Sequence, residues 1–453
     1  MLKKYTFKEI LDLSIPIIAE MTLYNLMGVF DTMMIGNYGG NKYLSAVGLS
    51  NGITYNISNI FVSVGLSVAI TSLVAQSVGR RNYKEAEAYA TLGFIVGNLI
   101  GFFISFNMYK FSKRILYMAG GRGEILYISN IFTRISVIGI FLKMNTEIIN
   151  SVLRGYKNTK VPFITSIIIS SFKILLDFIL IFGHGTKELG IVGAAVATCI
   201  AQAIGLVFSS FYIVTKLRVR PLFEPVVSSN ITKIKEIFRI YVPSFMEEGA
   251  YSISRLLCSV MIIASGSINF AANEIANTIE TISIVPSLAL GVAATSLVGA
   301  AFGEKNYKKA KKYAYGCTAI SVVIAIVFSL VFLLMPNFLV HFFVQNKEKQ
   351  VIYLASMCLL VGAIEQPFIA ISTVYEGALK GMGDGRTPLI VTLITGWILR
   401  VPLIYCFIYK LKYSVVYVWW ITNIQWIVDG ILICLMFNLG FSGKLRKYGK
   451  YKL

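Results

Sequence analysis

A stretch of 23 residues occurs twice in this chain of 453 residues. Residues 68–90 read VAITSLVAQSVGRRNYKEAEAYA and residues 292–314 read VAATSLVGAAFGEKNYKKAKKYA, with thirteen identical positions and no gap. Two shorter motifs return at almost the same interval: Pro-x-x-x-Glu at 16–20 and 243–247, and a basic residue followed by glycine at 154–155 and 380–381. Self-similarity of this kind indicates a duplicated structural unit.

The duplication predicts two lobes of similar length, residues 1–215 and residues 240–453. Between them lies the longest polar connection of the chain, residues 216–239, which contains Pro221 and Pro225. Its composition suits a cytoplasmic linker that lets the lobes move relative to each other.

The chain is far more apolar than a soluble domain. Its mean hydropathy is +0.71, and only 14% of its residues are charged, against about 25% in a typical soluble domain. Apolar runs long enough to cross a bilayer, about 20 residues each, lie at 13–35, 44–75, 88–109, 125–152, 161–182, 191–214, 240–264, 271–300, 313–335, 351–378, 388–408 and 415–439. We therefore predict an all-α integral membrane protein with twelve transmembrane helices, six in each lobe.

An even number of spans per repeat brings both copies into the membrane in the same orientation, which is a parallel internal repeat. Although the net charge is +20, the Lys and Arg residues alternate with the spans instead of forming one patch, which argues against a nucleic-acid partner. Most of them fall in the connections on the N-terminal side of the membrane. The positive-inside rule then places both termini in the cytoplasm of a multi-pass protein of the cell (plasma or inner) membrane.

Nothing in the sequence suggests an enzyme, a metal site or a cofactor. The only histidines, His184 and His341, are not in an H-E-x-x-H motif, and no glycine-rich nucleotide loop follows a strand. The six cysteines stand singly in apolar runs, which is typical of core residues.

Carboxylates inside the first span are candidate functional groups. Helical spacing places Glu20 and Asp31 on one stripe at different depths. A carboxylate in a span costs about 2.5–3.5 kcal/mol on insertion scales, so it is expected to face the protein interior. Asp31 is the stronger candidate, whereas Glu20, nearer the cytoplasmic end, has either a transport role or the role of a hydrated cap.

Spans four and five carry several more charges. Glu147 lies in the fourth span, while Lys173 and Asp177 are one turn apart on one face of the fifth. We expect Lys173 to form an ion pair with Glu147 or Asp177, because an unpaired buried charge costs far more than a paired one. The alternative is that such a pair only holds the lobe together.

In the second lobe, Glu247 and Glu248 follow Pro243, with Arg255 two turns further on, and Glu365 lies in the tenth span. Neighbouring carboxylates in a cavity of low dielectric constant repel each other, so at least one is expected to carry a proton. The counterpart of Asp31 in this lobe is Cys258, so the lobes differ in their charges.

Several motifs together resemble those of the multidrug and toxic compound extrusion (MATE) family. They are VFDTMMIG at 29–36, LRG at 153–155 followed by Pro162, LDFILIFG at 176–183, GIVGAAVAT at 190–198, LVG at 297–299 followed by Gly303, and LKGMGDGRTP at 379–388. The resemblance extends over essentially the whole chain. It implies an antiporter that expels amphipathic, mostly cationic organic compounds in exchange for H⁺ or Na⁺. We expect this antiporter to work by alternating access, without a cofactor and as a monomer in the lipid bilayer.

Carried over residue by residue, Asp31 and Asp177 match acidic positions of the family's first lobe. Glu247 or Glu248 matches its glutamate in span seven, and Glu365 matches its acidic residue in span ten. One difference is Lys173, where many relatives have asparagine. This built-in cation disfavours Na⁺, so coupling in the first lobe is expected to use protons, or to have moved to the glutamates of the second lobe.

A second function stays open at this point. A flippase for a lipid-linked sugar, from the same fold superfamily, would need several cations for a pyrophosphate, and the spans contain Arg134, Lys143, Lys173, Arg255 and Arg400.

Overall fold

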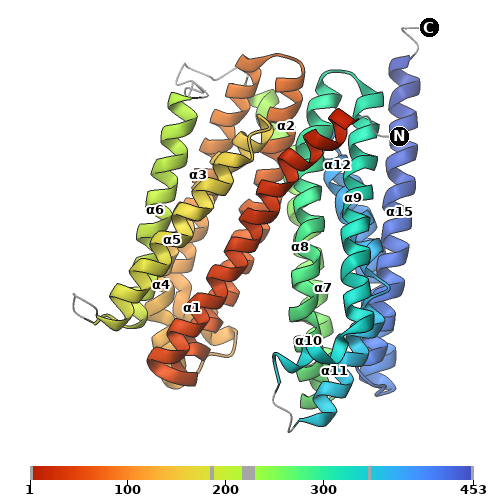
Figure 1. Cartoon of the computed structure of the whole chain (residues 1–453). Helices are drawn as coiled ribbons and strands as arrows, with labels where there is room; N and C mark the ends of the chain where they lie inside the picture. The colour runs from red at the N-terminus through yellow and green to blue at the C-terminus, as the bar shows by residue number, and fades with distance from the viewer. Residues whose placement is uncertain (1–3, 184–187, 217–229, 345–347, 450–453) are drawn as a thin grey trace. The chain divides into compact units, whose positions relative to one another are not determined.

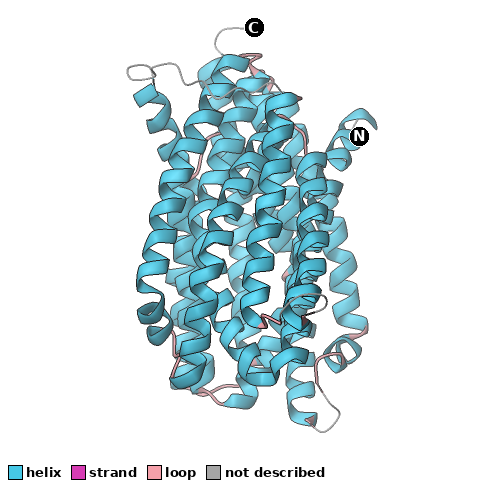
Figure 2. Ribbon diagram, turned by 90° about the vertical axis from the view of Figure 1, so that its left-hand side faces the viewer, coloured by secondary structure: helices cyan, strands magenta, loops and turns pink. Residues whose placement is uncertain are grey.

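The computed structural model describes residues 4–183, 188–216, 230–344 and 348–449, and every regular element in these ranges is a helix (Figures 1 and 2). Most of the predicted linker, residues 217–229, lies outside the described residues. Its last part, residues 230–239, is already helical and begins α7.

The first half consists of α1 (Lys4–Ser58), η1 (Asn59–Leu66), α2 (Ser67–Gly79), α3 (Tyr83–Met118), α4 (Gly123–Gly155), α5 (Lys160–Phe182) and α6 (Ile191–Thr215). α1 is interrupted at Gly40, whose φ of 64° and ψ of −159° are not helical. This combination is essentially restricted to glycine, so Gly40 separates two helical segments within the connection predicted between the spans 13–35 and 44–75.

The second half consists of α7 (Asn230–Ala264), α8 (Ser267–Gly303), α9 (Tyr307–Leu334), α10 (Pro336–His341), α11 (Lys349–Gly362), α12 (Gln366–Gly381), α13 (Arg386–Thr392), η2 (Leu393–Arg400), α14 (Val401–Ile404), η3 (Tyr405–Lys410) and α15 (Val416–Gly449). The axes of α11 and α12 are bent by 55° relative to each other. η1, η2 and η3 are π-helical stretches, which occur frequently at functional sites.

Within the described residues, nine helices are long and apolar enough to cross a membrane, or up to ten if the bent pair α11 and α12 counts as one span. One of the nine, Thr6–Gly79, includes the break at Gly40. α7 is not among them, because it carries Arg239, Glu247, Glu248 and Arg255. The prediction of a multi-pass α-helical protein is therefore confirmed, while the count of twelve spans stays a prediction.

The repeated Asn-Tyr-Lys motif forms the same turn in both halves. Asn82 caps α3 by accepting a hydrogen bond from the backbone N–H of Glu85 at 3.2 Å, and Asn306 caps α9 by accepting one from Lys309 at 3.0 Å. Such caps satisfy amide groups that have no partner inside the helix. The sequence repeat is thus also a repeat of local structure.

The chain divides into two compact units, the first unit formed by Ile15–Tyr241 and the second unit by Met1–Ser14 together with Val242–Leu453. In each repeat the boundary between units falls just before a proline of the first helix, Pro16 in α1 and Pro243 in α7. The start of each of these helices therefore belongs to the unit that contains most of the other repeat.

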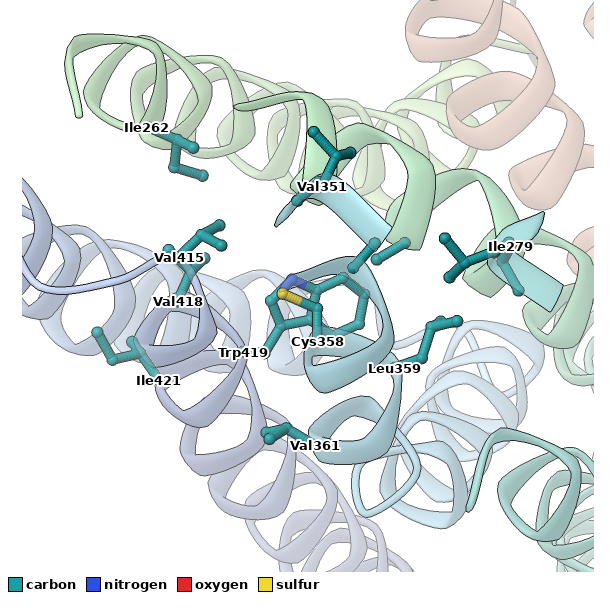
Figure 3. Packing of buried hydrophobic residues seen from close by; sticks show 14 of the residues in the cluster. Ile262, Ile279, Val351, Cys358, Leu359, Val361, Val415, Val418, Trp419 and Ile421 are labelled. Carbon is teal, nitrogen blue, oxygen red and sulfur yellow. The ribbon is translucent and has the colours of Figure 1, made fainter. Parts of the chain in front are cut away.

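The core of the second unit contains Trp419 of α15, which packs among apolar side chains of α8 and α11 (Figure 3). Gly362 makes room for it, because a Cβ atom there would lie 2.6 Å from the indole ring. Cys258, Cys317 and Cys358 are buried as predicted, but Cys406 is exposed, so the expectation of a core position is wrong for that residue.

Candidate functional site

Lys173 of α5 lies between two carboxylates of the first unit. Its Nζ atom is 2.7 Å from Asp31 Oδ1 on α1 and 2.7 Å from Asp177 Oδ2 on α5. Lys173 is 4% exposed and Asp177 is 1% exposed. One ammonium group therefore pairs with two carboxylates, and the group of three has a net charge of −1 when no proton is bound.

Because this group is buried, a change in the charge of any of its three residues has a large effect on stability. Removing one partner of a buried ion pair typically costs about 3–5 kcal/mol, because it leaves the other charge without compensation. Binding or release of one proton at Asp31 or Asp177 changes the balance by one charge in the same surroundings. The arrangement is thus suited to a proton-dependent change in structure or in affinity for a cation.

Glu147 does not pair with Lys173. Its Oε2 atom lies 3.5 Å from Nη1 of Arg154 on the same helix, α4. Arg154 also donates a hydrogen bond from Nη2 to Glu20 Oε1 at 2.8 Å. Glu20 is therefore not a hydrated cap at the membrane surface but a buried residue, 1% exposed, in an ion pair with Arg154.

The second unit contains the repeat-related pair. Lys380 Nζ of α12 donates a hydrogen bond to Glu247 Oε1 of α7 at 2.8 Å, and both residues are buried. Glu20 and Glu247 end the repeated Pro-x-x-x-Glu motif, while Arg154 and Lys380 begin the repeated basic-residue and glycine motif. The two motifs are the two halves of one ion pair, which forms once in each repeat.

The other candidates of the second unit lie in different surroundings. Glu365 is buried at the bend between α11 and α12. The next residue, Gln366, donates a hydrogen bond to Glu280 Oε1 of α8 at 3.1 Å. Glu248 is half-buried and Arg255 is exposed on α7.

Two other basic residues of the first unit, Lys143 and Arg134, contact aromatic rings. Lys143 Nζ lies 5.9 Å from the ring centre of Tyr24 and 5.0 Å from that of Tyr55. Such cation–π contacts contribute about 0.5–2 kcal/mol. Arg134 donates to Ser112 Oγ at 3.4 Å and lies over the ring of Tyr109.

Four charged residues of the helices were not among the candidates predicted from the sequence. Arg154 and Lys380 appeared only as the basic residues of a repeated motif, although their recurrence at the repeat interval was visible. Glu376 and Asp429 were not singled out, although Asp429 stands in the apolar run 415–439 and was therefore open to the same argument as Asp31. Among the described residues, no group of three or more His, Cys, Asp or Glu side chains could hold a metal ion.

Comparisons with known proteins match nearly the whole chain. A probable multidrug resistance protein NorM from Thermotoga maritima is 26% identical over 441 residues, covering 97% of this chain and 93% of the relative. An uncharacterised transporter, YisQ of Bacillus subtilis, is 24% identical and covers 91% of this chain and 90% of the relative. The matched proteins are transporters, and no catalytic activity or cofactor is indicated for them.

The fold is also that of a solved transporter. A structure described as the outward-facing conformation of a multidrug resistance MATE family transporter of the MOP superfamily superposes with a TM-score of 0.89 at 24% identity, covering 97% of this chain and 96% of that one. The MatE family model matches the chain twice, at residues 16–179 and 243–406, once in each repeat. This chain therefore belongs to the MatE family of multidrug and toxic compound extrusion transporters.

Proposed function

We propose that this chain exports amphipathic, mostly cationic organic compounds across the cell membrane in exchange for protons, by alternating access. The observation that carries the choice of ion is the position of Lys173 between Asp31 and Asp177. A sodium ion bound to these carboxylates would stand next to an ammonium group at a high Coulomb cost. A proton can bind either carboxylate without this repulsion.

In the proposed cycle, the drug path opens to one side of the membrane at a time. With both carboxylates ionised, the group of three residues has a net negative charge and favours a cationic drug. Protonation from outside removes that charge, which weakens the hold on the drug and favours its release. Asp31, Asp177 and Lys173 would therefore couple the ion gradient to export, while Glu20 and Glu147 would act through Arg154.

The second unit is the alternative place for the coupling site. Its candidates are Glu247 and Glu365, with Glu248 and Arg255 nearby on α7. The burial of Glu365 favours this alternative, because a second acid, Glu280, accepts a hydrogen bond from the neighbouring residue Gln366 and two nearby carboxylates repel each other.

The aromatic side chains near Lys143 are candidates for the drug site. The rings of Tyr24 and Tyr55 already face an ammonium group. An organic cation has the same preference for ring faces, so it could take the place of Lys143 there. We expect the transporter to work as a monomer with both termini in the cytoplasm.

The experiment is efflux of a cationic dye from proteoliposomes under an imposed pH gradient or an imposed Na⁺ gradient. We expect the pH gradient alone to drive efflux and Asp177→Asn to abolish it. Asp12→Asn, an exposed aspartate on α1, is the matched control and keeps wild-type efflux. Efflux that runs on Na⁺ alone and needs Asp177 would contradict proton coupling in the first unit.

The comparisons do not favour the flippase for a lipid-linked sugar, since the matched relatives are multidrug transporters. The same vesicles test this alternative directly. A lipid with a pyrophosphate headgroup should neither compete with the dye nor change sides faster in the presence of the protein.

A further inference from the structure

Asp429 of α15 is a buried carboxyl group that the transport scheme above does not use. Its Oδ1 atom lies 2.5 Å from the hydroxyl of Ser372 on α12, and its Oδ2 atom lies 2.7 Å from the hydroxyl of Thr395 in η2. Asp429 is 3% exposed, and both hydroxyl residues are completely buried. Three elements that are separate in the sequence thus converge on one carboxyl group.

Each of these hydroxyls also faces a second acceptor. Ser372 Oγ lies 3.4 Å from Glu376 Oε1, and Thr395 Oγ1 lies 3.0 Å from the carbonyl oxygen of Val391. A hydroxyl group has only one hydrogen to donate. If Asp429 and Glu376 are both ionised, the hydrogen of Ser372 can serve one carboxylate, and the other faces an oxygen lone pair.

A proton on Asp429 removes this conflict. Asp429 then donates from Oδ1 to Ser372 Oγ, and Ser372 donates its own hydrogen to Glu376. Thr395 can donate to the other oxygen of Asp429. An unmade hydrogen bond at a buried polar group costs about 1–3 kcal/mol, so the protonated form is the one that these contacts favour.

The contacts continue beyond Glu376 towards α7. Glu376 Oε2 lies 3.8 Å from Lys380 Nζ, and Lys380 is paired with Glu247. Within the described residues, Oε2 of Glu247 is buried and has no hydrogen-bond partner, and the residue is 6% exposed. A row of polar groups therefore runs from Asp429 to Glu247, with an open acceptor at its far end.

The charges along this row also call for a proton. Three carboxyl groups, those of Asp429, Glu376 and Glu247, stand against one ammonium group, that of Lys380, so the fully ionised row would have a net charge of −2. Glu376 and Glu247 both interact electrostatically with Asp429. The other element that packs on Asp429, η2, contributes the hydroxyl of Thr395 and ends in Arg400. A proton at Asp429 halves the excess charge.

The local backbone at Thr395 points to a functional position as well. Thr395 lies in η2, a π-helical stretch, Leu393–Arg400. A π-helical turn contains an additional residue, which changes the direction of the side chains that follow, and such turns are frequent at functional sites. Here the wide turn accompanies the contact between Thr395 and Asp429.

We propose that Asp429 is a proton-binding site of the second unit, protonated at rest, and that it exchanges its proton through Ser372 and Glu376 along the row that ends at Glu247. In the exchange step the proton of Asp429 passes to Ser372 Oγ while the hydroxyl proton of Ser372 passes to Glu376 Oε1. Rotation of the Ser372 hydroxyl then turns its hydrogen back towards Glu376. The starting state returns when Glu376 gives up its proton and Asp429 takes up a new one, and no other bond forms or breaks in this step.

This proposal rests on the proposed proton-coupled export, and the experiment separates the two. Infrared spectra of the purified protein in lipid discs report protonated carboxyl groups by their C=O stretching band, which carboxylates lack. We expect Asp429→Asn to remove one component of this band at neutral pH and Asp12→Asn to leave it unchanged. The same two variants are then measured in proteoliposomes, where Asp429→Asn should lose efflux driven by a pH gradient.

The outcomes are distinct. An unchanged carboxyl band in Asp429→Asn overturns the proton site whatever the efflux shows. If wild-type efflux ignores the pH gradient, the proposed function fails, while the band still decides whether Asp429 holds a proton.

A second variant covers the case in which Asp429→Asn does not fold. Ser372→Ala keeps the carboxyl group but removes its link to Glu376. In Ser372→Ala, the C=O band of protonated Asp429 should persist at a shifted frequency. After transfer to D₂O, the carboxyl proton of Asp429 should exchange with deuterium more slowly than in the wild type. An unshifted band and unchanged exchange would contradict the relay through Ser372.

Discussion

The hydroxyl of Tyr313 on α9 donates a hydrogen bond to the carboxylate of Glu9 at the start of α1. The same contact exists a second time, between Tyr89 on α3 and Glu236 at the start of α7. Tyr89 and Tyr313 are both buried and occupy the same position of the long repeat. Each repeat therefore fixes the beginning of the other repeat's first helix by the same pair of side chains.

Replacing Tyr313 by phenylalanine should release the start of α1. The loss of one hydrogen bond to a charged group is expected to lower the free energy of unfolding by about 1.5–3 kcal/mol. Limited trypsin digestion after Lys8 should become faster in this variant. Tyr315→Phe is the control, since Tyr315 bonds to Asn438 and not to α1; equal cleavage rates in both variants would contradict the role of the Glu9 contact.

Replacing Lys173 by methionine should destabilise the first unit by about 3–5 kcal/mol, because Asp31 and Asp177 then repel each other without compensation. Adding Asp177→Asn in the same protein removes one of the two negative charges and should recover much of the loss. Thermal unfolding of the wild type, both single variants and the double variant gives the coupling energy. A coupling energy near zero would mean that Lys173 does not balance these carboxylates.

Glu247→Gln should be more damaging than Glu248→Gln. Both residues belong to α7, but only Glu247 forms the buried ion pair with Lys380, so its replacement leaves the ammonium group of Lys380 with weaker compensation. We expect Glu247→Gln to unfold at a lower temperature than Glu248→Gln, by an amount that corresponds to more than about 1 kcal/mol of unfolding free energy. Equal stability of the two variants would show that the pair contributes nothing to the fold.

Gly40→Ala should destabilise the protein by about 1 kcal/mol or more, and Gly48→Ala should not. No atom lies within 4 Å of the position of a new Cβ at either residue, so crowding is the same. Of these two glycines, only Gly40 has a positive φ, 64°, a backbone conformation that residues with a side chain disfavour. At the helical Gly48, alanine is expected to be neutral or to stabilise by about 0.4–1 kcal/mol. Equal unfolding midpoints would contradict the role assigned to the backbone at Gly40.

The sequence predicted best those features that depend on a single helix or on the order of motifs along the chain. The pair of Lys173 and Asp177 follows from a spacing of four residues on one helix. The multi-pass helical architecture follows from hydropathy, because apolar runs of about 20 residues have the length of spanning helices, whereas the strands of a membrane barrel need only about 9–11 residues. The family could be recognised because its motifs keep their order along the chain.

Contacts between helices were harder to predict. Glu20 and Arg154 are 134 residues apart, and helical periodicity gives the face of each helix but not the helix that it meets. Glu147 was considered as a partner for Lys173, but in the folded chain it pairs with Arg154. Asp429 depends on three elements that converge only in the folded chain, so its hydroxyl partners had no signal in local sequence.

The two repeat-related ion pairs, Glu20 with Arg154 and Glu247 with Lys380, differ in the chemistry of their cations. The guanidinium of Arg154 cannot lose its proton in a protein, whereas the ammonium of Lys380 can. A gene duplication begins with identical halves, so one basic residue has since been replaced by the other. A guanidinium, with its planar set of N–H donors, now stands beside Glu20, and a compact ammonium group stands beside Glu247.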